Sequence, residues 1–120
     1  MKIAIIGSRS AGPETFDMIL RHLPAGCTEI ISGGAKGTDS YAHRAALKLN
    51  LKFTCIRPLY RKFGRVAPLY RNYAIIDRAD CVLAFWDGCS KVTRQAIACC
   101  INRHKPFKVF LINMRDKIAI

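Results

Sequence analysis

The stretch that points most directly to chemistry reads SGGAKGTD and runs from Ser32 to Asp39. It follows an apolar run at residues 29–31 and precedes a helical pattern at residues 40–49. Glycines between a strand and a helix, here Gly33 and Gly34, let backbone N–H groups approach a ligand, and the helix N-terminus favours negative charge. The stretch matches neither GxGxxG nor GxxxxGK(S/T). It is therefore either a phosphate-binding loop or a tight turn.

Alternating strand and helix patterns must position these residues. Strand patterns cover residues 2–6, 28–32, 51–56, 80–86 and 107–112, helical patterns cover 13–23, 40–49, 67–78 and 91–102, and 115–120 form a short tail. Such alternation predicts a parallel sheet with right-handed crossovers and helices on both faces. The predicted fold class is α/β, a three-layer sandwich with a mainly parallel five-stranded sheet and about four helices, in one domain over residues 1–120.

The loops that follow the strands hold nearly all of the small, polar and basic candidates. They read GSRS at Gly7–Ser10, SGGAKGTD, RPLY at Arg57–Tyr60 and WDGCS at Trp86–Ser90. Turns at the opposite ends of the strands, such as residues 24–26, are ordinary. Because ligands of parallel α/β sheets bind outside the carboxyl ends of the strands, these loops predict one binding edge.

The first two of these loops offer several kinds of phosphate contact. Gly7 and Ser8 provide an approachable backbone and a hydroxyl donor, and Arg9 provides a forked cation for phosphate or carboxylate. Thr38 either caps the following helix or donates to a phosphate oxygen. Asp39 either caps that helix or binds a ribose hydroxyl.

The WDGCS loop leaves similar alternatives open. Asp87 either binds a hydroxyl or begins an Asp-Gly turn. Trp86, the only tryptophan, either stacks on a base or packs in the core. The residues predicted to bind the ligand are Gly7, Ser8, Arg9, Ser32, Gly33, Gly34, Gly37, Thr38, Asp39, Tyr60, Arg71, Asn72, Trp86, Asp87, Gly88, Ser90 and Thr93.

The composition favours an anionic partner. A formal net charge of +12 over 120 residues raises the encounter rate with nucleotides, nucleic acid or acidic proteins. One basic group lies at residues 57–71, and a second lies at residues 103–108, where it also fits a helix end that complements the helix dipole. Six cysteines without a CxxC pair indicate buried thiols in a reducing compartment, and no signal peptide or membrane segment is recognisable. A cytoplasmic protein without a metal site or a membrane partner is expected.

In order along the chain, the motifs GSR, SGGAKGTDxxA, PxY, APxxRN and ADxVLAFWDGxS resemble the small bacterial SLOG-superfamily proteins related to YspA and YpsA. Those proteins are similar in fold to the Rossmann-like domain of the DNA processing protein A and to the Lonely Guy phosphoribohydrolases. The resemblance implies a Rossmann-like domain that binds a nucleotide or a nucleotide-derived ligand, such as AMP, ADP-ribose or an NAD-like molecule. It also implies a homo-oligomer.

The hydrolase branch of this resemblance is disfavoured at two positions. Lonely Guy enzymes cleave an N-glycosidic bond with an arginine on the third helix and a glutamate after the fourth strand. Arg71 matches the arginine, but Ala96 stands at the glutamate and Val92 stands at a glycine of the phosphate-side loop. Alanine has no carboxylate to stabilise an oxocarbenium ion. If a reaction is catalysed, the candidate residues are Arg71, Asp39 and Asp87.

Three functions follow, in order of preference. The first is a nucleotide sensor or carrier that holds phosphate with the SGGAKGTD and GSR loops. The second is a nucleoside-monophosphate phosphoribohydrolase-like enzyme. The third is a single-stranded nucleic-acid-binding accessory protein, which the charge and the resemblance to the DNA processing protein A favour. Against the third function, the sequence shows no interleaved aromatic residues suited to a stacking platform.

Overall fold

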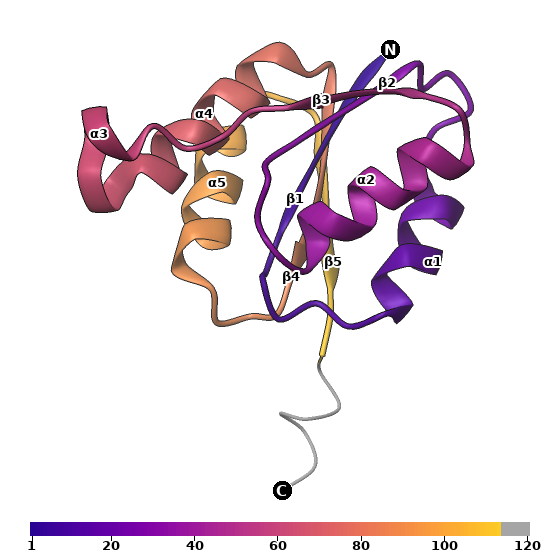
Figure 1. Cartoon of the computed structure of the whole chain (residues 1–120), viewed down its shortest axis with the longest axis horizontal. Helices are drawn as coiled ribbons and strands as arrows, with labels where there is room; N and C mark the ends of the chain where they lie inside the picture. Colours follow the sequence, from indigo (N-terminus) through magenta and orange to yellow (C-terminus); the bar gives the residue numbers. More distant parts are fainter. Residues whose placement is uncertain (114–120) are drawn as a thin grey trace, which may run out of the picture.

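Five parallel strands form one sheet through the centre of the molecule (Figure 1). The structure is a computed structural model and describes residues 1–113. The strands are β1 (Lys2–Gly7), β2 (Glu29–Ser32), β3 (Lys52–Cys55), β4 (Cys81–Trp86) and β5 (Phe107–Leu111), in the order β3-β2-β1-β4-β5. Every neighbouring pair is parallel, so the predicted sheet is confirmed. The tail predicted at residues 115–120 lies outside the described residues.

Helices cover both faces of the sheet and complete the three layers (Figure 1). The helices α1 (Glu14–His22) and α2 (Thr38–Lys48) pack together on one face, and α4 (Ala67–Arg78) and α5 (Lys91–Asn102) pack together on the other. The side chains of β1 pack alternately against the two helical layers, because successive residues of a strand point to opposite faces. Ile3 and Ile5 join the core under α1 and α2, whereas Ala4 and Ile6 join the core under α4 and α5. The predicted α/β, Rossmann-like arrangement is therefore confirmed.

The connection from β3 to α4 is more structured than the loop predicted there. It contains a short helix, α3 (Tyr60–Phe63), and a 3-10 helix, η1 (Gly64–Val66). Neither contains a buried residue. Figure 1 shows α3 at the margin of the molecule, away from the sheet.

The start of α2 also differs from the prediction. The helix begins at Thr38, and the residue before it is Gly37, whose φ of 70° lies in the left-handed region. Neither Thr38 nor Asp39 is the cap, and no side chain caps this helix. Instead, the Thr38 hydroxyl donates to the carbonyl oxygen of Ser8 at 3.0 Å. The glycine therefore sets the direction of the chain, and the threonine joins two loops.

The strand order creates a crevice at one edge of the sheet. The chain leaves β1 for α1 on one face and leaves the neighbouring β4 for α5 on the other face. The loops after these two strands therefore separate at the carboxyl end, which is where ligands bind in open α/β sheets.

The buried cysteines are unreactive thiols of the core. Cys27, Cys99 and Cys100 are buried. Loss of solvation raises the pKa of each thiol, that of Cys100 to about 11. These thiols are therefore protonated at neutral pH. Within residues 1–113, no helix is both long enough and apolar enough to span a bilayer.

Candidate functional site

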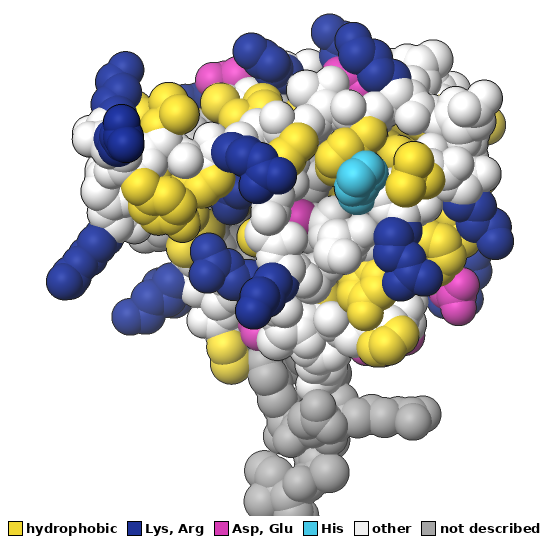
Figure 2. Space-filling model, in the orientation of Figure 1, with side chains coloured by type: hydrophobic (Ala, Val, Ile, Leu, Met, Phe, Trp, Pro, Cys, Tyr) yellow, Lys and Arg dark blue, Asp and Glu magenta, His cyan; other side chains and the backbone are white. Residues whose placement is uncertain are grey.

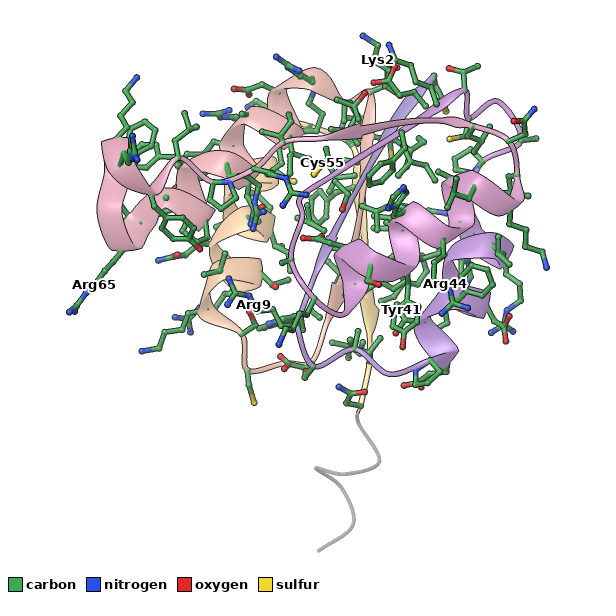
Figure 3. All side chains as sticks on the ribbon, viewed as in Figure 1. Lys2, Arg9, Tyr41, Arg44, Cys55 and Arg65 are labelled. Atoms are coloured by element: carbon green, nitrogen blue, oxygen red, sulfur yellow. The ribbon has the colours of Figure 1, made fainter. Side chains whose placement is uncertain are left out.

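Two adjoining cavities open at the carboxyl edge of the sheet. The first has a volume of about 420 Å³ and lies between the loops after β1 and β4 and the N-terminal ends of α4 and α5. The second has a volume of about 510 Å³ and lies between the loops after β2 and β3. Arg9, Ala35 and Arg71 line both, so the cavities adjoin, and we call the two together the hollow. Figure 3 shows Arg9 between the end of α2 and α5.

Arg71 is the buried cation of this hollow. Only 8% of its surface is exposed. Its Nε donates to Oδ1 of Asn72 at 2.9 Å, whereas its Nη1 is buried with no hydrogen-bond partner among the described residues. Leaving a buried charged donor unsatisfied is costly, so proteins normally pair such groups. Arg71 is therefore the candidate anion-binding residue of the hollow.

Gly33 and Gly34 make room for arginine side chains. A Cβ on Gly33 would lie 2.1 Å from Nη1 of Arg71, and a Cβ on Gly34 would lie 2.7 Å from Nη1 of Arg57. The SGGAKGTD loop can therefore lie directly against two guanidinium groups only because these two residues lack side chains. This use of the glycines differs from the predicted one, in which their backbone N–H groups approach the ligand.

The GSRS loop is fixed by hydrogen bonds to the start of α2 and to β4. Ser8 is buried, its N–H donates to the carbonyl of Phe85 at 2.9 Å, and its own carbonyl accepts from the Thr38 N–H at 3.3 Å. A Cβ on Gly37 would lie 2.4 Å from the carbonyl oxygen of Arg9, so glycine is required at this contact as well as by its φ. The loops after β1 and β2 are thus fixed to each other, and the Arg9 side chain remains exposed beside the hollow.

Asp39 is used to hold its own loop. One carboxylate oxygen lies 2.8 Å from the Ser32 hydroxyl, and the other accepts from the Ala35 N–H at 3.1 Å. The Ser32 hydroxyl also lies 2.7 Å from the carbonyl oxygen of Ile5 in β1. These contacts connect the SGGAKGTD loop to the central strand.

Asp87 holds the WDGCS loop in place through hydrogen bonds, as Asp39 does for the SGGAKGTD loop. Its Oδ1 accepts from the N–H groups of Cys89 and Ser90, both at 2.8 Å, and its Oδ2 accepts from the Ser10 hydroxyl at 2.9 Å. Partial burial raises the pKa of this carboxyl group, but hydrogen bonds from Ser90, Cys89, Ser10 and Ser8 outweigh it and lower the pKa to about 2. Asp87 is therefore ionised at neutral pH and joins the loops after β1 and β4.

Five cations and two carboxylates line the hollow: Lys91 lines the first cavity, the carboxylates are Asp39 and Asp87, and four further cations form no ion pair among the described residues. These four are Arg9, Lys36, Arg57 and Arg71. In the part of the chain that the structure describes, the ion pairs join Lys52 to Glu29 and Arg103 to Asp77, so they involve none of the four. Figure 2 shows Lys and Arg side chains around the middle of this face and over the α3 end. Cations therefore outnumber carboxylates in the lining of the hollow, which gives it a net positive charge.

The structure brings most of the predicted ligand-binding residues to this hollow. Gly7, Arg9, Gly34, Asp39, Tyr60, Arg71, Asn72, Asp87, Ser90 and Thr93 line its two cavities. Ser8, Ser32, Gly33 and Thr38 are buried behind the lining. Gly37, Trp86 and Gly88 line neither cavity. The half-buried Trp86 donates its indole N–H to the carbonyl of Ser90 at 3.1 Å.

Sequence reasoning missed several residues of the lining. Ser10, Lys36, Arg57 and Lys91 all line the hollow. Lys36 lies inside the SGGAKGTD stretch, and Arg57 is the second residue after β3. Their positions in loops that follow strands were the available signal. Among residues 1–113, no group of three or more His, Cys, Asp or Glu side chains is placed to hold a metal ion.

The fold and the site define a class of protein, a Rossmann-like α/β protein with an electropositive hollow where the strand order reverses. A family model described as DNA recombination-mediator protein A matches residues 1–59, which include the GSR and SGGAKGTD motifs. No curated protein matches the chain.

Two solved structures share the fold. The DNA processing protein A from Helicobacter pylori, described for its single-stranded DNA binding mode, has a TM-score of 0.72 and 21% identity, over 99% of this chain and 71% of that one. The DNA processing protein A from Streptococcus pneumoniae has a TM-score of 0.58 and 18% identity, over 98% of this chain and 60% of that one. At these identities the likeness establishes the fold alone.

Proposed function

We propose that this protein binds single-stranded nucleic acid through a phosphate held in the hollow at the carboxyl edge of the sheet. The observation that carries the proposal is the buried Nη1 of Arg71, which has no partner among the described residues. A phosphodiester supplies the missing acceptor and a negative charge at the same place. Arg9, Lys36 and Arg57 add three further cations around it.

Two features favour a polymer over a free nucleotide. The positive charge continues beyond the hollow through Arg61, Lys62 and Arg65, which lie on α3 and η1 and are exposed. A single mononucleotide cannot reach both places, whereas a strand tracks a cationic path. The structurally similar protein from Helicobacter pylori binds single-stranded DNA, which supports the same order of preference. The sequence analysis preferred a nucleotide sensor or carrier and placed single-stranded nucleic-acid binding third. This proposal reverses that preference.

A free nucleotide is the second candidate. The first cavity has a volume of about 420 Å³, within the usual range for small-molecule sites, and Asn72, Ser90 and Thr93 provide polar groups there. These groups fit the base or the sugar of AMP, ADP-ribose or an NAD-like molecule.

The more specific resemblance to the YspA and YpsA proteins, the homo-oligomer and the cytoplasmic location stay predictions.

Among residues 1–113, the carboxylates that line the hollow, Asp39 and Asp87, are both engaged in hydrogen bonds, which disfavours a hydrolase. Ala96, at the position of the expected glutamate, lies on α5 and is fully buried in the core that α4 and α5 share with the sheet. The carboxylates of Asp39 and Asp87 both accept hydrogen bonds from their own loops. Both carboxylates are therefore assigned to holding the walls of the hollow.

The test is fluorescence anisotropy with a labelled oligothymidylate of about ten nucleotides, a length within the usual site size of single-strand-binding folds. We expect Arg71→Gln to weaken binding about 10- to 100-fold, the effect of removing a hydrogen-bonded charge at a buried site. Arg9→Ala, at an exposed position, should weaken it less. Circular dichroism of both variants checks that the fold is retained.

The matched control is Arg78→Ala, which removes the same charge from the opposite end of α4. Equal weakening by Arg78→Ala and Arg71→Gln would show that only overall charge matters and would contradict the proposal. Competition with AMP, ADP-ribose and NAD separates the two candidates. If a mononucleotide binds tightly at about 200 mM salt and the oligonucleotide does not, the second candidate replaces the first.

A further inference from the structure

The segment from Leu59 to Tyr70 exposes apolar side chains that the core does not use. We call this segment the aromatic ridge. Leu59, Tyr60, Val66 and Tyr70 are between 45% and 59% exposed. No residue of α3 or η1 is buried, and Figure 1 shows α3 standing away from the sheet. Contiguous apolar exposure of this kind marks an interaction surface.

Ring contacts give the aromatic ridge its shape without covering it. Phe63 stacks on Tyr70 with ring centroids 4.3 Å apart and an interplanar angle of 18°. Tyr70 meets the edge of Tyr73 at 5.9 Å. Within residues 1–113, the Tyr60 ring makes no such contact with another ring or with a cation. The helices α3 and α4 therefore bring together rings that are separated in the sequence, a grouping that the sequence analysis did not predict.

The charge of the aromatic ridge selects an anionic occupant. Between Asp39 and Asp77 the sequence contains eight Lys or Arg residues and no acidic residue. Arg61, Lys62 and Arg65 are exposed, and none of them forms an ion pair among the described residues. Figure 3 shows the Arg65 side chain pointing away from the body of the molecule. The surface therefore combines open rings with unneutralised cations.

The aromatic ridge is continuous with the proposed phosphate site. Tyr60 lines the second cavity together with Arg57 and Arg71. A phosphate held by these arginines is therefore next to a ring on which the adjoining base can stack. Stacking on an aromatic side chain, flanked by cations for the backbone, is how proteins hold single strands without sequence preference.

We infer that Tyr60 stacks on a base of the bound strand and that the following nucleotides run along the aromatic ridge, with their phosphates near Arg61, Lys62 and Arg65. The inference rests on the proposed function and adds to it a base-contacting residue and a direction for the strand. A membrane surface suits the aromatic ridge less well, since α3 has only four residues and provides no long amphipathic face.

The test compares two labelled probes of equal length, an oligothymidylate and an abasic strand with the same phosphates and no bases. Tyr60→Ala should weaken binding of the oligothymidylate about tenfold and leave binding of the abasic strand unchanged. Tyr60→Phe, which keeps the ring, should restore the wild-type affinity. Leu59→Ala is the matched control, because Leu59 is equally exposed next to Tyr60 and has no ring.

The other outcomes contradict the stacking role of Tyr60, and they show whether the proposed function fails with it. If the wild-type protein binds the oligothymidylate and Tyr60→Ala binds it equally well, or loses both probes equally, the stacking role is wrong and the proposed function stands. If the wild-type protein binds neither probe, both proposals fail. If it binds vesicles of phosphatidylserine and phosphatidylcholine through Tyr60 and retains oligothymidylate binding in Tyr60→Ala, the aromatic ridge is a lipid surface instead.

Discussion

The loops around Arg71 and the aromatic ridge meet at Tyr60, which lines the second cavity, and they are built in opposite ways. The loops around Arg71 are connected by buried hydrogen bonds through Ser8, Ser32 and Thr38, and each glycine there meets another chain segment or side chain at short range. The aromatic ridge has no buried residue in α3 or η1 and is organised by ring contacts. A fixed, partly buried anion site is thus followed by an exposed surface that can adapt to successive nucleotides.

Because the loops around Arg71 are tightly packed, we expect a small added side chain there to lower the free energy of unfolding. This is the largest effect among the predictions that follow. A Cβ on Gly7 would lie 2.4 Å from the carbonyl oxygen of Phe85 and 2.5 Å from Oγ1 of Thr38. Because the first of these atoms belongs to the backbone of the neighbouring strand β4, Gly7→Ala should lower the free energy of unfolding by about 3 kcal/mol. Urea denaturation measures the loss.

Gly26→Ala is the control for that experiment. A Cβ there would meet nothing within 4 Å. This substitution in an exposed turn should change the free energy of unfolding by less than about 0.5 kcal/mol. Similar losses in both variants would contradict the view that the loop after β1 is tightly packed.

The Asp87 carboxylate tests the same contrast through pH. Its folded pKa of about 2 lies below the value of about 3.9 for an unfolded aspartate, so ionised Asp87 stabilises the fold above pH 4. That contribution is lost as the pH falls from about 4 to about 2. Asp87→Asn should therefore lower the free energy of unfolding by about 1 kcal/mol at neutral pH, and the difference from wild type should shrink across this acidic range.

Thermal unfolding at several pH values measures this difference. Asp17→Asn is a suitable comparison, because Asp17 is an exposed aspartate on α1, on the other face of the sheet. A difference between wild type and Asp87→Asn that stays constant down to pH 2 would show that the carboxylate does not hold the loop by charge.

The smallest effect is expected on the aromatic ridge itself. Arg65→Ala should leave the free energy of unfolding unchanged within about 0.5 kcal/mol, since Arg65 is exposed. It should reduce the slope of log affinity against log salt for an oligothymidylate by about 0.7, the value for one lost phosphate contact on a single strand. Titrations between about 50 and about 200 mM salt measure the slope. An unchanged slope would remove Arg65 from the path of the strand.

The sequence was sufficient to predict the sheet, the four longer helices and the edge of the sheet at which the hollow opens. Those inferences depend on local patterns, such as the apolar run of β1 and the polar loops after each strand. The short helices α3 and η1 were not predicted, because Tyr60–Phe63 and Gly64–Val66 bury nothing and so carry no apolar periodicity. The contact between Gly33 and Arg71 could not be predicted either, since it joins a loop to a helix residue 38 positions further along the chain.

Trp86 gives the molecule a built-in optical signal. It is the only tryptophan, it is half-buried, and its indole N–H is bonded to the carbonyl of Ser90, in the loop that forms one wall of the hollow. Any displacement of that wall alters the polarity and hydrogen bonding of a single indole. Occupancy of the hollow should therefore be readable from the intrinsic emission of the unlabelled protein.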